Sequence, residues 1–326
     1  MSQIRSHIVG TGYSLPAKVV TNDDLSKMVE TSDEWISTRT GIRSRHIASD
    51  GEYTSDFCVK AAHMALDNAG MKAEDIDFVI VATVTPDNTF PSTAAKVSKI
   101  LGIRSGVPAM DVNAACSGFV YASQIADNMI RLGQIKNALV IGAETLSRIV
   151  DWTDRNTCVL FGDGAGAAVF CGSEESGKNT DRGILSVKIF ADASHYETLC
   201  SDSGVSFNQK SGFVHMDGKE VFKMAIPSLV EGVETALNLA DLSLSDVDWY
   251  IPHQANARII DSVAKKLGID ENKVIITVDH HGNTSAASIP LALAVSVENG
   301  KIKTGDLVAI SSMGAGFTWG GMVVRI

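Results

Sequence analysis

An internal repeat constrains the fold of this chain more than any other feature of its sequence. The segment Ala65–Phe78 is matched further along by Ala236–Trp249, and Leu101–Ile103 is matched by Leu267–Ile269. After each Leu-Gly-Ile comes a short apolar strand, then a turn, then a helix of small residues. A repeat of this length indicates two structural units of the same kind, so we expect two similar α/β halves.

Short apolar segments alternate with amphipathic segments along the chain, which is typical of an α/β protein. The expected strands are Ile76–Val84, Ala138–Ala143, Ala167–Phe170, Ile184–Phe190, Trp249–Pro252, Val274–Val278, Leu307–Ser311 and Met322–Ile326. The expected helices are Ser55–Ala69, Ser92–Leu101, Ser117–Arg131, Glu220–Leu239, Ala257–Leu267 and Ser285–Glu298. Pro227 lies within the fourth helix and predicts a kink or a later start there. Thr31–Glu34 predicts a capping box that begins a short helix carrying Trp35.

Charge and cysteine content make several classes of protein improbable. The chain has 28 basic and 38 acidic residues, a net charge of −10, whereas a general nucleic-acid binder is usually basic. No apolar run is long enough for a membrane helix, and the first residues lack the apolar region of a signal peptide. The five cysteines are scattered and never spaced C-x-x-C. We therefore expect neither a disulfide framework nor a zinc site, and we expect a reducing cytoplasm.

Three polar residues from distant parts of the chain are candidates for chemistry. Cys116 lies between a strand and the first turn of a helix, where the helix N-terminus is expected to lower the pKa of a thiol. A buried core cysteine is the alternative. His253 follows the strand Trp249–Pro252, a position that often carries chemistry in α/β folds, although it could be a structural histidine. Asn283 could simply cap a helix, but the repeat gives it a place similar to that of Cys116. Packing of the halves about a pseudo-twofold axis would bring all three into one pocket.

Two glycine-rich segments and one basic helix have alternative interpretations. Gly162–Gly166 is not G-x-G-x-x-G and lies between two apolar segments, so we expect a tight turn between strands rather than a nucleotide loop. Gly314–Phe317 follows a strand, and its glycines could let backbone N–H groups face a pocket as an oxyanion hole requires, or could form a structural turn. The cations of Ala257–Leu267 form either a solvated face or a local basic patch on an acidic protein.

Several motifs lie in one register from about Ile8 to the C-terminus. They are Thr31–Trp35, Thr40–Arg43, Ala114–Phe119, Phe161–Gly166, Pro252–Asn256, His281–Ala286 and Gly316–Gly320. Together they resemble β-ketoacyl-acyl carrier protein synthase III, and their number and length make a chance match negligible.

The resemblance implies a thiolase-like α/β fold with two pseudo-symmetric halves in a five-layer αβαβα arrangement. Residues 1–172 would carry the nucleophilic cysteine, and residues 173–326 the histidine and asparagine. It also implies a cytoplasmic homodimer that condenses an acyl-CoA primer, usually acetyl-CoA, with malonyl-acyl carrier protein. This decarboxylative Claisen condensation initiates type II fatty-acid synthesis. The CoA and carrier-protein thioesters are its substrates, and no metal or redox cofactor is implied.

The resemblance also assigns roles to individual residues. Cys116 would be the nucleophile, His253 and Asn283 would hold the malonyl thioester oxygen, and the N–H groups of Cys116 and Ala315 would form the oxyanion hole. The residues implied along the CoA channel are Thr31, Trp35, Arg39, Arg155, Gly218, Phe222, Ala255 and Asn256. Those implied to meet the carrier protein are Gln254, Ala255, Asn256, Ala257, Arg258, Lys223, Lys265 and Lys266. Those implied to bound the acyl pocket are Phe90 from across the dimer, Leu146, Phe161 and Met313.

Some positions depart from the best-known members and leave the primer open. Trp152, His280 and Met313 stand where proline, arginine and phenylalanine are usual, and residues 194–214 match poorly. A related condensing enzyme or acyltransferase of specialised metabolism, using another primer, is therefore the alternative function. A degradative thiolase is disfavoured because no cysteine follows Cys200, and an elongating synthase because Asn283 stands where a second histidine would be needed. A catalytically silent binding module would not need to keep Cys116, His253 and Asn283.

Overall fold

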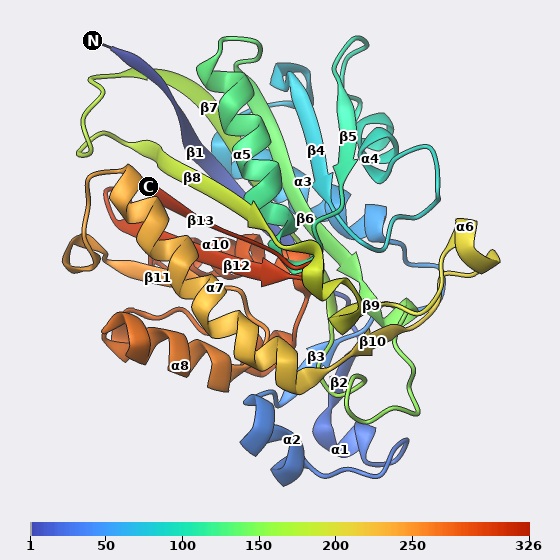
Figure 1. Cartoon of the computed structure of the whole chain (residues 1–326). Coiled ribbons are helices and arrows are strands. Elements are labelled where there is room, and N and C mark those ends of the chain that lie inside the picture. The colour runs from blue at the N-terminus through green and yellow to red at the C-terminus, as the bar shows by residue number, and fades with distance from the viewer. Residues whose placement is uncertain (1) are drawn as a thin grey trace.

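The computed structural model describes residues 2–326 and contains two sheets of matching topology (Figure 1). The first has five strands in the order β1 (Gln3–Ser14), β7 (Asp163–Glu175), β6 (Asn137–Thr145), β4 (Phe78–Ala82) and β5 (Ala109–Val112). The second has four, in the order β8 (Gly183–Ala191), β13 (Thr318–Arg325), β12 (Leu307–Gly314) and β11 (Trp249–Pro252). Each order begins with two antiparallel pairings and continues with a parallel one. A parallel bridge from Tyr250 to Val274 occupies the place that β5 has in the first sheet.

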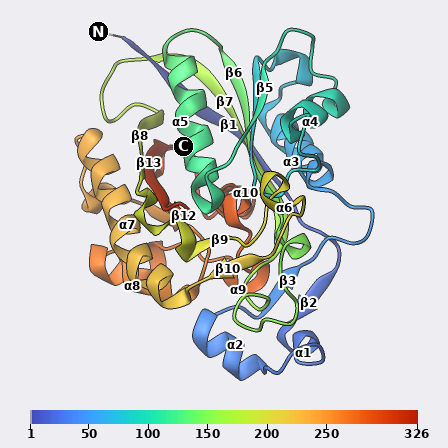
Figure 2. The ribbon, with the colours of Figure 1, turned by 45° about the vertical axis from the view of Figure 1, so that its right-hand side comes forward.

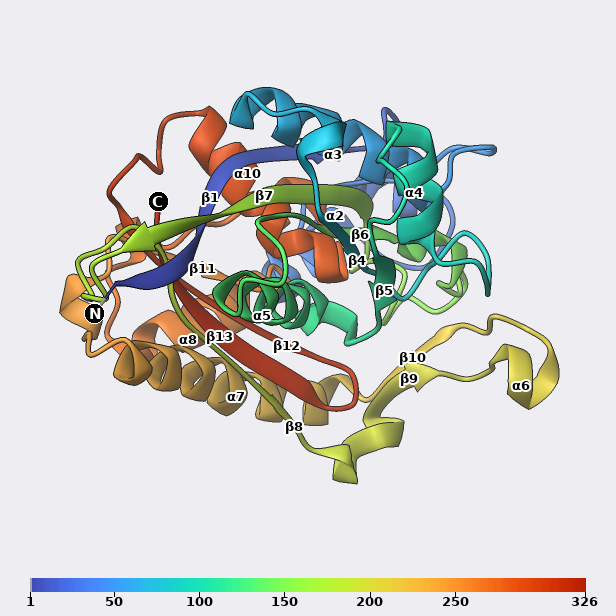
Figure 3. The same ribbon diagram turned by 90° about the horizontal axis from the view of Figure 1, so that it is seen from above.

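Three layers of helices complete the five-layer αβαβα arrangement. Helices α5 (Gly118–Arg131) and α10 (Ser288–Glu298) lie between the two sheets, as Figures 2 and 3 show. Helix α3 (Thr54–Ala69) covers the outer face of the first sheet, and α4 (Thr93–Leu101) lies beside it. The outer face of the second sheet is covered by α7 (Gly218–Leu239) and α8 (Ala257–Leu267) (Figure 3). Helix α10 is apolar on almost every side and nearly all of it is buried, as a central helix must be.

The smaller elements lie at one end of the sheets, where the chain connections carry the candidate site. They are β2 (Val19–Thr21), α1 (Asn22–Leu25), α2 (Asp33–Thr40), β3 (Ser44–His46), β9 (Leu199–Ser201), α6 (Val205–Asn208), β10 (Val214–Met216) and α9 (Val278–His281). The excursion β9–α6–β10 projects from the body of the molecule (Figures 1 and 3). Among residues 2–326, no helix combines the length and the apolar character needed to span a membrane.

The sequence located most of the regular elements, although the list of expected strands lacks β1 and β5. Strand β11 and helix α8 have the predicted bounds, and helices α3, α4 and α5 begin within one residue of them. Helix α7 begins at Gly218 and continues through Pro227, so the predicted late start is wrong. The Asp217 carboxylate accepts the N–H groups of Lys219 and Glu220 and caps this earlier start.

Three other predictions of local structure need correction. Val274–Val278 forms a single bridge rather than a strand, and α9 begins at its last residue. The predicted helix Ser285–Glu298 begins as a 3₁₀ turn over Ser285–Ala287. At Thr31–Glu34 the N-cap of α2 is Ser32, whose hydroxyl accepts the N–H of Trp35, so a single cap takes the place of the predicted capping box.

Gly162–Gly166 does not form the predicted tight turn. From Asp163 onward it is the start of β7, the strand that pairs with both β1 and β6. Its glycines serve packing between the halves, because a Cβ on Gly166 would overlap the backbone of Leu291 in α10. Gly142 of β6 abuts Ala286 in the same way. The missing side chains therefore let the second half's central helix approach the first half's sheet closely.

Candidate active site

Cys116 lies in a 3₁₀ turn, Ala115–Ser117, between β5 and α5. Ala115 adopts a left-handed conformation with φ 46°, which is uncommon for a residue with a side chain. The second half holds this turn in place. The Ser312 hydroxyl of β12 donates to the carbonyl of Cys116 at 2.6 Å. A Cβ on Gly314 would lie only 2.6 Å from the backbone nitrogen of Cys116, so glycine is required for this approach.

His253 directly follows β11 and is almost completely buried. Its N–H donates to the carbonyl of Ser311, and its Nδ1 lies 2.7 Å from the hydroxyl of Ser288 at the start of α10. We assign the Ser288 hydroxyl as the donor to Nδ1 of the histidine, with the Ser288 oxygen also accepting the N–H of Gln254, and this assignment places the ring hydrogen on Nε2. Burial lowers the pKa of His253 to about 3. The ring is therefore neutral near pH 7 and presents one N–H donor.

Asn283 lies between α9 and the turn Ser285–Ala287. Its backbone forms a parallel bridge with Phe161 of the first half. Its Oδ1 accepts the N–H of Ser285 at 2.8 Å, which identifies Nδ2 as the other end of the amide. The side chain therefore has an NH₂ group to offer as a donor.

The turns before α5 and α10 have the same backbone form. Ser285 has φ 49°, close to the 46° of Ala115, and each residue begins a 3₁₀ turn that leads into a central helix. This register aligns Ala286 with Cys116 and Asn283 with Asn113. The prediction that Asn283 and Cys116 lie in similar turns of the two halves is therefore correct. Asn283 itself, however, lies three residues before the position equivalent to Cys116.

A chain of contacts connects the segments that carry the three predicted residues. Ser311 and Ser312 are neighbours on β12, and they bond to His253 and to Cys116 respectively. Ser288, which bonds to His253, lies one helical turn after Ser285, which donates its N–H to Asn283 and lines the cavity at Cys116. These contacts connect the backbones of Cys116 and His253 through neighbouring residues of β12, while the meeting of all three side chains in one pocket stays a prediction.

The electrostatic prediction for Cys116 is wrong. Burial raises the pKa of its thiol to about 12, whereas the helix N-terminus led us to expect a lower value. The hydroxyl of Ser285 acts to lower this pKa, and the charge of Glu144 acts to raise it further. Loss of hydration outweighs the helix terminus because a thiolate in this position would have little access to water. In the free protein Cys116 is therefore a thiol at neutral pH.

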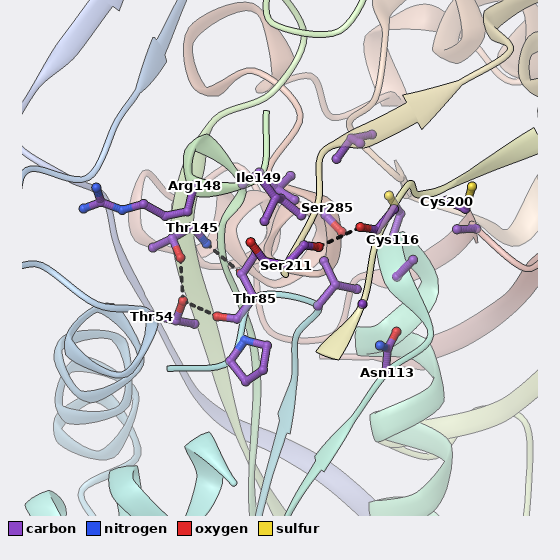
Figure 4. A pocket seen from close by; sticks show the side chains of 18 of the residues that line it. Thr54, Thr85, Asn113, Cys116, Thr145, Arg148, Ile149, Cys200, Ser211 and Ser285 are labelled. Atoms are coloured by element: carbon purple, nitrogen blue, oxygen red, sulfur yellow. Dashed lines mark hydrogen bonds between the residues drawn. The ribbon is translucent and has the colours of Figure 1, made fainter. Parts of the chain in front are cut away.

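A cavity of about 1000 Å³ opens at Cys116 (Figure 4). Cys116, Ser285 and Ala315 line one part of it, Thr54, Thr85 and Thr145 another, and residues of the β9–α6–β10 excursion a third. Two of the predicted acyl-pocket residues, Leu146 and Phe161, are in its lining. Met313 is buried outside the lining, and Phe90 is 83% exposed in the single chain. His253 and Asn283 are not in the lining either, so this cavity does not contain all three predicted residues.

The residues predicted to bind CoA form a second cluster, outside this cavity. The guanidinium groups of Arg39 and Arg155 lie 4.7 and 5.1 Å from the ring centre of Trp35. The side-chain amide of Asn256 donates to the carbonyl of Arg39 and links the loop after β11 to α2. The buried hydroxyl of Thr31 has no hydrogen-bond partner within the chain. Gly218 and Phe222 lie in the first turns of α7.

Four of the eight predicted carrier-protein residues, Arg258, Lys223, Lys265 and Lys266, are exposed cations on α7 and α8. Arg258 lies 5.8 Å from the ring of Phe222, while Lys223 and Lys265 pair with acidic neighbours on their own helices. Gln254 is an exception and must be corrected, because it is 1% exposed. Its amide donates to the carbonyls of Pro252 and Ile275 and accepts two backbone N–H groups at the start of α9. It therefore holds the loop together and cannot touch a docked protein.

The sequence interpretation missed the residues that support the site, Ser285, Ser288, Ser312 and Glu144. The repeat offers a signal for Ser285, since it aligns with Ala115, but the side chains of the other three give no pattern in the sequence. Within residues 2–326, no cluster of three or more His, Cys, Asp or Glu side chains could hold a metal ion.

Two family models match the chain. One, 3-oxoacyl-[acyl-carrier-protein] synthase III, matches residues 110–193, and the other, the C-terminal part of the same synthase, matches residues 237–326. A curated relative named beta-ketoacyl-[acyl-carrier-protein] synthase III, from Rhodospirillum centenum, is 57% identical over 322 residues, which cover 99% of each chain.

Solved structures agree with the sequence comparisons. The 3-oxoacyl-[acyl-carrier-protein] synthase III of Aquifex aeolicus has a TM-score of 0.91 and 47% identity, over 98% of this chain and 100% of that chain. The priming β-ketosynthase of a polyketide biosynthetic pathway has a TM-score of 0.92 and 33% identity, over 99% and 97% of the two chains. The chain belongs to the β-ketoacyl-acyl carrier protein synthase III family of condensing acyltransferases and has the thiolase-like fold of that family.

Proposed function

We propose that this protein condenses acetyl-CoA with malonyl-acyl carrier protein and so initiates type II fatty-acid synthesis. The observation that carries this proposal is the pairing of a thiol with two neutral donors. Cys116 lies on the turn before α5, while His253 and Asn283 each have a free N–H to direct at a substrate oxygen. A nucleophile and a separate donor pair suit a reaction that first forms an acyl-enzyme and then an enolate.

In the first step the sulfur of Cys116 attacks the thioester carbonyl of the primer, and CoA leaves. The N–H groups of Cys116 and Ala315 would hold the oxyanion that forms. The contact between Gly314 and the Cys116 nitrogen supports this role, because it brings the two backbone segments together. The glycine-rich turn after β12 would thus complete the oxyanion hole.

In the second step malonyl-acyl carrier protein loses carbon dioxide. The departing electrons place negative charge on the thioester oxygen, and the donors of His253 and Asn283 would hold that oxygen. Each donor would contribute on the order of 3 kcal/mol to transition-state stabilisation in a dry site. The resulting carbanion attacks the acyl group on Cys116 and forms the 3-oxoacyl product. These steps use the substrates' own thioesters and require neither a metal nor a redox cofactor.

The surroundings support the predicted substrates and partners. Stacking between Arg39, Arg155 and the indole of Trp35 suits an adenine ring. The exposed cations Arg258, Lys223, Lys265 and Lys266 suit an acidic carrier protein, although the whole chain is acidic. We also propose a homodimer, because a partner would cover the exposed ring of Phe90.

Two further assignments belong to this proposal. The halves would be residues 1–172 and 173–326, which is supported by the matching strand orders, with the boundary in the last residues of β7. The location would be the cytoplasm, which is supported by the presence of five free cysteines.

A specialised condensing enzyme with another primer is the second candidate. Its support is the structural likeness to a polyketide priming β-ketosynthase and the size of the cavity at Cys116. Intact-mass measurement with a panel of acyl-CoAs, followed by peptide mapping, distinguishes the two. An acetyl group on Cys116, formed faster than any other adduct, is the expected result. An adduct only from branched, longer or aromatic primers would favour the alternative, and no adduct from any primer would contradict both.

A further inference from the structure

Arg45 is a completely buried cation that the proposed steps do not use. It lies in β3, which pairs with β2 at the end of the molecule that carries the site (Figure 1). Burial lowers the pKa of Arg45 to about 10, so its guanidinium remains charged near pH 7. Its hydrogen bonds within residues 2–326 all end on neutral oxygens. A buried charge that is bonded to no carboxylate is costly, so its presence calls for a physical reason.

The guanidinium of Arg45 connects two separate segments of the chain. Nη1 donates to the carbonyl of Val20 at 3.2 Å and to Oδ1 of Asn22 at 2.9 Å. Nη2 donates to the carbonyl of Val159 at 2.8 Å. A planar guanidinium holds acceptors in fixed directions on more than one side, which a lysine ammonium does not do. Arg45 therefore sets the distance between the start of α1 and the segment that contains Val159.

Asn22 supports this link at one end. Its Nδ2 donates to the Asp33 carboxylate and to the carbonyl of Ile42, at 2.7 Å in each case. Asp33 lies in the first turn of α2, so the buried amide of Asn22 connects α1 with α2. The guanidinium of Arg45 is therefore held against two helices and a strand, and its position is well defined.

The segment after Val159 holds the backbone of Asn283. The N–H of Asn283 donates to the carbonyl of Leu160 at 2.8 Å. The N–H of Gly162 donates to the carbonyl of Asn283 at 3.0 Å. The carbonyls of Val159 and Leu160 belong to consecutive peptide groups. The bond from Arg45 to the first of these carbonyls therefore restricts the direction of the second.

The aliphatic part of Arg45 packs against glycines on both sides of this contact. A Cβ on Gly282 would lie 3.1 Å from the Cβ of Arg45, and one on Gly162 would lie 3.2 Å from it. Gly282 directly precedes Asn283, and Gly162 donates to the carbonyl of Asn283. One side chain of the first half therefore contacts both segments that place this residue of the second half.

We propose that Arg45 is a positioning residue that holds Asn283 where its amide can donate to the malonyl thioester oxygen. This inference rests on the proposed function, in which that donation assists decarboxylation. Without Arg45 the carbonyl of Val159 would lose a buried donor, and the backbone that carries Asn283 would shift to restore one. A shift of about 1 Å in a catalytic group costs on the order of 10²-fold in rate.

Acylation of Cys116 should not depend on Arg45. The turn that carries Cys116 is held by the hydroxyl of Ser312 and by the close approach of Gly314. The hydrogen bonds of Arg45 go to other segments. Comparison of the two steps of the reaction therefore separates a positioning role from a general loss of structure.

The test is to measure both steps in Arg45→Met, which removes the charge but keeps a long side chain. Release of carbon dioxide from malonyl-acyl carrier protein should fall about 10²-fold. Acylation by acetyl-CoA should be unchanged, as should the carrier-protein concentration that gives half the maximal rate. Arg45→Lys should restore part of the loss, because it keeps a buried donor near Val159.

Arg5→Met is the matched control. Arg5 is another buried arginine, and its guanidinium donates to the carbonyls of Ile184 and Leu185, at the start of β8. This variant should also lose stability, but it should release carbon dioxide at the normal rate when folded. A loss equal to that of Arg45→Met would show that any buried arginine has this effect and would overturn the proposal.

A double variant tests whether Arg45 acts through Asn283. Arg45→Met with Asn283→Ala should release carbon dioxide no more slowly than Asn283→Ala alone, because the donor that Arg45 positions is already absent. A further loss in the double variant would make Arg45 a purely structural residue and overturn the proposal. Equal losses in acylation and decarboxylation, or an unchanged rate of carbon dioxide release in Arg45→Met, would do the same.

If Arg45→Met does not fold, Arg45→Lys decides by the same two measurements. A loss of about tenfold in carbon dioxide release, with normal acylation, would support the proposal. Equal losses in both steps, or no loss, would overturn it. Failure of the unmodified protein to release carbon dioxide from malonyl-acyl carrier protein would instead contradict the proposed function.

Discussion

The turn before α5 and the turn before α10 have one backbone form but supply opposite kinds of chemistry. The first presents the thiol of Cys116 to a large cavity. The second supplies the buried Asn283 amide and, through Ser288, holds His253 as a neutral donor. A duplicated framework therefore fixes where two groups meet, while the side chains on each copy decide what each contributes. The four predictions below test this division of labour.

The largest effect is expected for the nucleophile itself. Cys116→Ala should remove the acyl adduct and lower condensation by more than about 10³-fold, since it removes the proposed nucleophile that holds the acyl intermediate. Moving the thiol to the equivalent turn, as Cys116→Ala with Ala286→Cys, should not restore the adduct, because Ala286 is buried away from the cavity lining. An acyl group mapped to position 286 would show that the two turns are interchangeable in chemistry.

Variants of the second half should separate the two steps. His253→Ala and Asn283→Ala should each lower condensation by about 10²–10³-fold, because each removes a donor to the enolate oxygen. Both should still take an acyl group from acetyl-CoA at nearly the normal rate. Intact mass reports the first step, and release of carbon dioxide from malonyl-acyl carrier protein reports the second. Equal losses in both steps would mean that the halves do not divide the reaction.

A smaller effect is expected at the carrier-protein surface. Arg258→Glu should lower turnover with malonyl-acyl carrier protein about tenfold at low salt, while acylation by acetyl-CoA is unaffected. The loss should shrink as ionic strength rises, because exposed charges are screened. Lys72→Glu makes the same charge change at an exposed site in the first half and should have no effect. A similar loss in both variants would indicate a general charge effect rather than docking.

The smallest expected effect is an opposite pH dependence of stability in the two halves. Burial lowers the pKa of His253 to about 3, so its contribution to folding is present above pH 6.5 and is lost as the pH falls. Burial raises the pKa of Glu144 to about 7, so its contribution is present below pH 4.5 and is lost as the pH rises through 7. Urea unfolding gives the difference in unfolding free energy between pH 5 and pH 7.5. His253→Gln and Glu144→Gln should change this difference in opposite directions, each by about 1–2 kcal/mol. A change in the same direction for both variants would contradict the directions given for the two pKa values.

Most of the fold could be predicted from the sequence because local patterns encode it. The repeat, the apolar strands and the Leu-Gly-Ile segments led to the matching halves, and α8 and β11 have the predicted bounds. The errors occurred where long-range packing decides local structure. The segment from Asp163 to Gly166 is part of β7, and the absence of a side chain at Gly166 leaves room for α10 to pack against this strand. Val274–Val278 has strand-like composition, yet it has room for only one bridge at the edge of the second sheet.

The sequence by itself determined the family, the repeat and the three residues Cys116, His253 and Asn283, because these depend on motifs and their order along the chain. Only the tertiary structure decided the ionisation of Cys116, the tautomer of His253 and the buried position of Gln254. Each of these depends on how much water reaches a group and which hydroxyl or carbonyl lies beside it. Segments far apart in the sequence set those surroundings, as when Ser312 of the second half donates to the carbonyl of Cys116 in the first.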